Sequence, residues 1–234
     1  ALSLHREESY GFFIFLNNDA QIGIEDIERM ESILDSMPDV GIVGPVVQNK
    51  LNGEQYFGLY VDWNRGRCDY NAEVDASGSQ GSVLDVDLVS GCGMMLPKRV
   101  LDEVKDFDNR FFLYWEDTDL NVRVRKAGYR TVIATEAHMS HRPSQSTGND
   151  SPLMEYYMTR NSLLFFSLHT SGFFKRNRVI ARLMVKRTLK GARQILRGHP
   201  KLGKALLFGV FDFVRGRSGF SSRIDHRAYQ DTDK

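Results

Sequence analysis

Hydrophobic residues in the first half of the chain form short continuous runs that alternate with helical spacings. Residues 12–16 and 40–47 are mostly apolar, as in strands buried on both faces, and residues 83–96 predict a further strand interrupted by glycines. Apolar positions at helical spacing fill 24–37, and the helix predicted over 116–127 ends at Gly128, a common helix-capping residue. A strand follows over 129–134. The alternation predicts a layered α/β domain.

Beyond residue 151 the pattern is helical throughout. Apolar residues recur at helical spacing over 152–169, 178–197 and 201–215. Charge changes with the pattern: residues 1–172 carry 15 Lys or Arg and 26 Asp or Glu, whereas residues 173–217 carry 13 Lys or Arg and the single acid Asp212. We therefore expect an α/β domain over residues 1–150 and C-terminal amphipathic basic helices over residues 151–234.

Composition excludes several classes of protein. With 234 residues, 41% hydrophobic and 26% charged, the chain is neither a disordered tail nor a disulfide-stapled miniprotein. Its apolar runs fall short of the ~18 residues that a membrane span needs. The two cysteines, Cys68 and Cys92, give no disulfide framework, which predicts a reducing, cytoplasmic location. Zinc spacings and RNA-binding motifs are absent from the sequence, so no nucleic-acid partner is expected.

The first candidate for chemistry is Asn17-Asn18-Asp19, directly after a predicted strand. Ligands of open α/β sheets bind at the carboxyl ends of strands, and a carboxylate flanked by amide oxygens suits a hard cation such as Mg²⁺. Asn and Asp also cap turns for purely local reasons, and on its own the segment favours that interpretation.

The second candidate is the segment 111–120, in which four aromatic residues lead into Glu116, Asp117 and Asp119. Apolar rings and neighbouring carboxylates both raise the pKa of a carboxyl group, which suits a general base. Alternatively, the three acids fill the first turn of a helix and complement its dipole, while the aromatic residues belong to the core.

Two further positions follow strands. His141 comes after the strand that begins at residue 129, at the sheet edge where Asp19 is expected, although a lone histidine is more often structural. Gly91 and Gly93 flank Cys92; glycines within a strand permit close approach of a ligand but also mark a bulge. Cys92 itself is expected to be a small packing residue.

The order of these motifs carries a family resemblance. The chain shows, in turn, residues 16–20 (LNNDA), 41–45 (GIVGP), 86–95 (VDLVSGCGMM), 107–123 (FDNRFFLYWEDTDLNVR), Gly128-Tyr129 and His141. In this order they resemble inverting glycosyltransferases of family 2, which have the GT-A fold, and in particular the rhamnosyltransferase-like members. The resemblance covers roughly residues 10–217. It implies a GT-A-like mixed sheet flanked by helices, followed by a basic C-terminal helical segment.

The resemblance also implies roles for individual residues. Asn17-Asn18-Asp19 matches the family's D-x-D, with Asn in place of the first Asp, so that Asp19, together with His141, is expected to bind Mg²⁺ or Mn²⁺. Asp117 matches the catalytic base. The residues expected to contact donor or acceptor are Asn17, Asn18, Gly91, Cys92, Gly93, Trp115 and Glu116.

The implied reaction moves a sugar, with rhamnose as the first candidate, from a nucleotide-diphosphate donor to a cell-surface or lipid-linked glycan. The family normally begins with strand–helix units that bind the nucleoside, and here only residues 1–10 precede the first strand. We therefore expect these units to be missing and this polypeptide alone to bind donor poorly. The alternatives are a non-catalytic glycan- or membrane-binding module and, third, a metal-dependent phosphohydrolase.

The basic helices predict a further partner. Amphipathic helices with Lys and Arg on one face lie on anionic membrane surfaces, so peripheral association with the inner face of the cell membrane is expected. In the alternative, the basic face packs on the acidic domain or on a second subunit.

Overall fold

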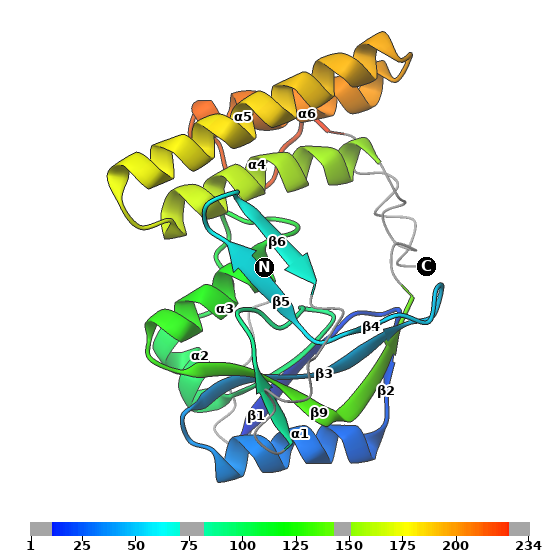
Figure 1. The fold of residues 1–234 in the computed structure, drawn as a ribbon, viewed down its shortest axis with the longest axis vertical. Helices are drawn as coiled ribbons and strands as arrows, with labels where there is room; N and C mark the ends of the chain where they lie inside the picture. Colours follow the sequence, from blue (N-terminus) through cyan, green and yellow to red (C-terminus); the bar gives the residue numbers. More distant parts are fainter. Residues whose placement is uncertain (1–10, 71–81, 143–150, 225–234) are drawn as a thin grey trace. The chain divides into compact units, whose positions relative to one another are not determined.

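The structure is a computed structural model that describes residues 11–70, 82–142 and 151–224 (Figure 1). Its described residues divide into two compact units. One contains residues 11–61, 68–70, 82–107 and 117–142, and the other contains residues 62–67, 108–116 and 151–224. The expected domain boundary at residue 150 lies outside the described residues and stays a prediction.

The first unit is built on a seven-stranded mixed sheet. Its strands are β1 (Phe12–Leu16), β2 (Ala20–Ile22), β3 (Val40–Asn49), β4 (Gln55–Tyr56), β7 (Val83–Asp85), β8 (Gly93–Pro97) and β9 (Arg130–His141). The order is β1-β8-β3-β9-β2, with β4 also paired to β3 and β7 to β9. The neighbours β3 and β9 run parallel, whereas β1 with β8, β8 with β3 and β2 with β9 are antiparallel. A separate two-stranded sheet joins β5 (Leu59–Asp62) and β6 (Arg67–Tyr70).

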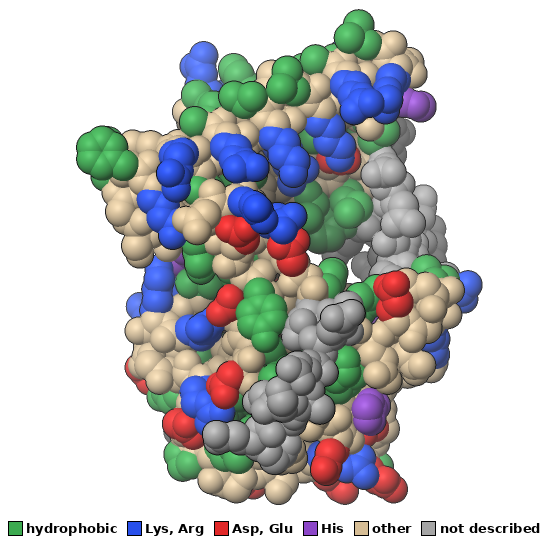
Figure 2. Space-filling model, viewed as in Figure 1, with side chains coloured by type: hydrophobic (Ala, Val, Ile, Leu, Met, Phe, Trp, Pro, Cys, Tyr) green, Lys and Arg blue, Asp and Glu red, His purple; other side chains and the backbone are tan. Residues whose placement is uncertain are grey.

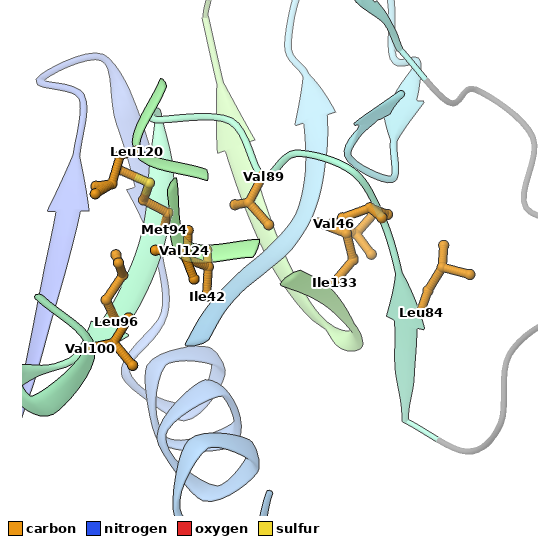
Figure 3. Close-up of a cluster of buried hydrophobic side chains, with 11 residues drawn as sticks. Ile42, Val46, Leu84, Val89, Met94, Leu96, Val100, Leu120, Val124 and Ile133 are labelled. Atoms are coloured by element: carbon orange, nitrogen blue, oxygen red, sulfur yellow. The ribbon is translucent and has the colours of Figure 1, made fainter. Parts of the chain in front are cut away.

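Helices cover both faces of the large sheet. α1 (Ile24–Ser36) packs Met30, Ile33 and Leu34 into one hydrophobic cluster. α2 (Lys98–Val104) and α3 (Glu116–Lys126) contribute to the cluster on the opposite face, which Figure 3 shows. That cluster contains Ile42, Val46, Leu84, Val86, Val89, Met94, Leu96, Val100, Leu120, Val124 and Ile133. The expected α/β fold, a mixed sheet flanked by helices, is confirmed.

Two details of the strand predictions are wrong. Residues 83–96 form two strands, β7 and β8, because residues 86–92 leave the sheet between them. β1 is half-buried rather than buried on both faces, because it lies at the sheet edge and pairs with β8 alone among the described strands. The apolar run predicted the strand but could not show its place in the sheet.

The second unit contains the three C-terminal helices α4 (Pro152–His169), α5 (Phe173–Leu196) and α6 (Pro200–Val214) (Figure 1). Ser151 caps α4 by accepting a hydrogen bond from the Met154 N–H at 3.1 Å, and Pro152 occupies the first turn. A Cβ added to Gly203 would lie 2.5 Å from the Gly191 carbonyl oxygen, so glycine is needed where α5 and α6 meet. Among the described helices, none has both the length and the apolar composition of a membrane span.

Candidate active site

Asp19 and His141 are neighbours at the end of two adjacent strands. Asp19 follows the turn after β1 and precedes β2, whose first residue, Ala20, pairs with His141 at the end of β9. This register brings His141 Nε2 to 3.0 Å from Asp19 Oδ1, and each side chain is less than one fifth exposed. A carboxylate is a preferred ligand of Mg²⁺ and Mn²⁺, and an imidazole nitrogen can complete the coordination of a divalent transition metal such as Mn²⁺.

Asn17 and Asn18, the other residues of the expected metal-binding motif, form the turn itself. The Asn17 carbonyl oxygen accepts a hydrogen bond from the Ala20 N–H at 3.1 Å, and both asparagine side chains are exposed. Within the described ranges no group of three or more His, Cys, Asp or Glu residues is arranged to hold a metal ion. A cation at Asp19 and His141 would therefore take its remaining ligands from substrate phosphate and water, as Mg²⁺ commonly does.

Asp117 lies in the first turn of α3 and is bound to the segment that links β7 and β8. Its Oδ2 accepts a hydrogen bond from the Gly91 N–H at 2.8 Å, and its Oδ1 accepts one from the Thr118 N–H at 2.6 Å. A Cβ at Gly91 would lie 2.8 Å from both Cβ and Oδ2 of Asp117. Glycine at position 91 is therefore what lets this backbone approach the carboxylate.

Asn121, one turn later in α3, was not recognised in the sequence. It is fully buried, its Oδ1 accepts a hydrogen bond from the Val89 N–H at 2.8 Å, and its Nδ2 donates to the Val89 and Asp117 carbonyl oxygens at 3.0 and 2.8 Å. The side chain thus holds the first turn of α3 against residues 89–91. The third carboxylate, Asp119, instead pairs with Arg123 at 2.7 Å and is buried.

A pocket of about 180 Å³ opens in the first unit beside these groups. Its apolar wall includes Pro45, Val47, Leu59, Val89 and Ile133. Ser90, Cys92, Gly93 and His141 line it too, together with Asn49, Gly58 and the rings of Tyr56 and Tyr70, which lie 4.7 Å apart. An apolar pocket with a few polar groups is typical of a small-molecule site. The pocket therefore borders both the loop that binds Asp117 and the histidine that contacts Asp19.

Cys92 lines this pocket as a protonated thiol. Burial raises the pKa of Cys92 to about 11. The hydrogen bond with the Ser90 hydroxyl lowers this pKa in part, whereas the negative charges of Asp117 and Asp19 raise it further. At neutral pH almost none of the group is thiolate, the form that attacks carbon or binds metal. The prediction that Cys92 is a packing residue agrees with this burial.

We expect Cys92 to resist alkylation. A thiol of pKa about 11 holds on the order of a few hundredfold less thiolate at pH 7.5 than an ordinary cysteine. Iodoacetamide labelling of the Cys68→Ser variant, followed by mass spectrometry, should proceed at least ~100-fold more slowly than labelling of glutathione. Urea-unfolded protein is the control, and labelling of folded protein at the unfolded rate would contradict the burial of Cys92.

Trp115 and Glu116 directly precede Asp117, at a backbone turn with unusual dihedral angles. Tyr114 and Trp115 have φ of 63° and 74°, a region that non-glycine residues rarely adopt. The Trp115 ring packs on Phe165 and Phe166, with centroids 5.0 and 5.7 Å apart, and among the described residues its indole N–H has no hydrogen-bond partner.

Asn161 of α4 binds this turn, a function that the sequence did not indicate. Its Nδ2 donates to the carbonyl oxygens of Leu113 and Tyr114 at 2.8 and 2.9 Å. Arg160 donates from Nε to Asn161 Oδ1 at 3.0 Å, which orients the amide, and its guanidinium is buried over the ring of Tyr157.

Comparison with known proteins places the chain among relatives of glycosyltransferases. It is 24% identical over 176 residues to the N-acetylglucosaminyl-diphospho-decaprenol L-rhamnosyltransferase of Mycobacterium tuberculosis, in both strain CDC 1551 / Oshkosh and strain H37Rv. The match covers 69% of this chain and 57% of the relative. The chain thus spans little more than half the length of the curated proteins that it matches. No protein-family profile matches it.

Among solved structures, a crystal structure of GalNAc-T7 with UDP, GalNAc and Mn²⁺ aligns with a TM-score of 0.49 and 9% identity. That alignment covers 81% of this chain and 42% of the other. The sequence match confirms the relationship to glycosyltransferases that the order of the motifs predicted. The roles of individual site residues stay predictions.

Proposed function

We propose that this relative of glycosyltransferases transfers a sugar from a nucleotide-diphosphate donor to a glycan acceptor, with inversion at the anomeric carbon. The proposal is supported by the residues that lie at one pocket. A single pocket is lined by His141, which contacts Asp19, and by the 90–93 segment, whose Gly91 N–H binds Asp117. The proposed metal-binding pair thus has His141 in the wall of this cavity, and the proposed base, Asp117, is hydrogen-bonded to Gly91, which lies between the lining residues Ser90 and Cys92. The similarity to a rhamnosyltransferase supports rhamnose as the sugar and a lipid-linked glycan as the acceptor.

Asp19 and His141 would hold a divalent cation, Mg²⁺ or Mn²⁺. The 3.0 Å separation of their ligand atoms is compatible with a shared cation, since adjacent ligands about 2.1 Å from an octahedral ion lie about 3 Å apart. When bound, such a cation acts as a Lewis acid that neutralises the charge of a leaving diphosphate. The exposed amides of Asn17 and Asn18 would contact the donor beside it.

Asp117 would be the general base. The acceptor hydroxyl oxygen forms a bond to the anomeric carbon while the bond from that carbon to the diphosphate oxygen breaks, and the electron pair leaves with the diphosphate. The hydroxyl proton passes to the Asp117 carboxylate. The Gly91 and Thr118 N–H groups fix one lone pair on each carboxylate oxygen, which orients the group. One in-line displacement inverts the anomeric centre.

The remaining predicted residues would shape the two substrate sites. The pocket-lining Cys92 and Gly93, with the adjacent Gly91, would surround the donor sugar, and the protonated Cys92 thiol would contribute packing rather than nucleophilic attack. Trp115 and Glu116 would shape the acceptor site.

The test of donor binding is a thermal-shift panel of UDP, dTDP and GDP, each with and without Mg²⁺ or Mn²⁺. A ligand at a hundredfold excess over its Kd stabilises a folded protein by about 2.7 kcal/mol. For a chain of this size that corresponds to a rise in Tm of about 5–10 °C. Millimolar nucleotide also reveals weak binding. We expect one nucleotide to raise Tm, with a larger rise when the cation is present.

Variants of the metal-binding pair sharpen this test. Asp19→Asn should remove the cation-dependent part of the shift, whereas Asp35→Asn, an exposed acid on α1, should leave it intact. A cation-dependent shift that persists in Asp19→Asn would contradict the metal role of Asp19. If no nucleotide raises Tm, even in a chain extended at its N-terminus by nucleoside-binding units, while acceptor glycan still binds, the non-catalytic binding module becomes the better account.

A further inference from the structure

α5 is the most basic element of the described chain, and its charges divide between two sides. Phe173–Leu196 contains eight Lys or Arg residues and no Asp or Glu. On the inner side Val179, Leu183 and Gly191 are buried, and Lys190 pairs with Glu155 of α4. Four other cations are exposed, namely Arg178, Arg182, Lys186 and Arg193. Figure 2 shows Lys and Arg side chains gathered over the C-terminal helices.

The outer side of α5 also carries an apolar stripe. Its members are Phe174, Ala181, Val185, Leu189, Ala192 and Leu196, all of them exposed. They recur at intervals of three, four or seven residues, which places them along one side of an α-helix. Phe174 and Leu196, near the two ends, are 87% and 88% exposed, and Val185 and Leu189, between them, are 59% and 65% exposed. The stripe therefore runs the length of the helix in contact with solvent.

The cations border this stripe. An α-helix turns by about 100° per residue. Around the helix axis, Arg182, Lys186 and Arg193 therefore lie about 60–100° to one side of Val185, whereas Arg178 lies within the stripe itself. A shallow hollow on this side is lined by Ala181, Arg182, Val185, Lys186 and Leu189. Apolar side chains and the ends of long cations are thus presented together over four turns or more.

The chemistry of this surface selects one kind of partner. A second copy of α5 docked symmetrically would bring two rows of cations together, which is unfavourable. A nucleic acid would neutralise the cations but would leave Val185 and Leu189 without an apolar partner. An anionic bilayer satisfies both features, because its headgroups attract Lys and Arg while the acyl boundary accepts apolar side chains.

We propose that the outer side of α5 binds the surface of anionic phospholipid membranes, with its apolar stripe at the acyl boundary and its cations at the headgroups. The helix lies in the plane of the interface and does not cross it. This proposal does not depend on sugar transfer, because the surface is defined by α5 alone. If both proposals hold, the enzyme would meet a lipid-linked acceptor at the membrane that carries it.

Vesicle flotation with the full chain tests the proposal, without donor or acceptor. We expect binding to vesicles of 30% phosphatidylglycerol in phosphatidylcholine, at least tenfold weaker binding to pure phosphatidylcholine, and loss of binding as salt rises from 0.05 to 0.5 M, since screening shortens the range of the attraction. Comparable binding to the neutral vesicles, or no binding to the anionic ones, would overturn the proposal.

Matched variants separate the two features of the surface. Val185→Gln with Leu189→Gln removes apolar area, and Arg182→Gln with Lys186→Gln removes charge; all four positions are exposed, so the fold should be retained. Each pair should weaken anionic binding at least tenfold. Ile24→Gln, which replaces a residue 68% exposed on α1, should bind like the wild type. Wild-type binding by the Val185/Leu189 variant, or dimerisation that this variant abolishes, would instead assign the stripe to another partner.

Discussion

Replacing Asp117 with Asn should lower the turnover of sugar transfer at least ~100-fold, the usual scale for removal of a general base. Asparagine keeps the size of the side chain and one carbonyl oxygen, so it can still accept a hydrogen bond from Gly91 or Thr118. It cannot take the proton of the acceptor hydroxyl. The loss should therefore fall on kcat, while the nucleotide-dependent rise in Tm is preserved.

The measurement needs a control variant with the same Asp-to-Asn change elsewhere in the chain. Asp35→Asn makes the same change at an exposed position of α1 and should leave kcat unchanged. If Asp117→Asn keeps wild-type turnover, Asp117 is not the base. If instead the variant loses turnover and nucleotide binding together, the carboxylate holds residues 89–91 in place, and its role is structural.

The outlines of the helices could be predicted because their signals are local. Four helices, α1, α3, α4 and α6, begin and end within about one residue of the predicted ranges. Pro152 and Pro200 mark the starts of α4 and α6, and Gly128 follows the end of α3. α5 begins at Phe173, five residues earlier than predicted, because exposed Phe173 and Phe174 do not follow the apolar spacing of the buried side.

The site was only partly accessible from sequence, because its contacts join segments far apart in the chain. Asp19 follows β1 and His141 ends β9, so a shared sheet edge could be predicted, and the register of β2 with β9 brings them together. Asn121 and Asn161 gave no such signal. Each is a buried amide whose partners lie 32 and 47–48 residues away, and polar residues within a helix are ordinarily solvent-exposed.

The three carboxylates of α3 also show that contacts in the fold could not be predicted from the sequence. From the sequence, two interpretations applied equally to Glu116, Asp117 and Asp119. Either all three stabilise the first turn of a helix through its dipole, or they lie near the active site. In the structure Asp119 turns to Arg123 and is buried, whereas Asp117 faces Gly91. The two acids meet different surroundings because residues two positions apart on a helix point about 200° apart, and the role of Asp117 as a base stays a prediction.

Removing the amide of Asn161 should destabilise the second unit by at least about 2 kcal/mol. Asn161→Leu has a similar volume but leaves the Leu113 and Tyr114 carbonyl oxygens without their donor, and each lost partner costs about 1–3 kcal/mol where the group is shielded from water. The positive φ angles of Tyr114 and Trp115 cost ~1–3 kcal/mol each in the folded chain and persist only while the surroundings hold them. The turn should therefore relax when the amide is lost.

Two measurements separate this effect from a general loss of stability. Tm should fall by about 5–10 °C, against a change of less than ~2 °C for Ser167→Ala, which removes a hydrogen bond within the same helix. In a Trp63→Phe background Trp115 is the sole tryptophan, and its emission should move to longer wavelength in Asn161→Leu as its packing on Phe165 and Phe166 loosens. Unchanged Tm and emission would show that the aromatic contacts hold the turn without Asn161. A shifted emission well below Tm would instead identify the amide as the group that positions the residues leading into Asp117.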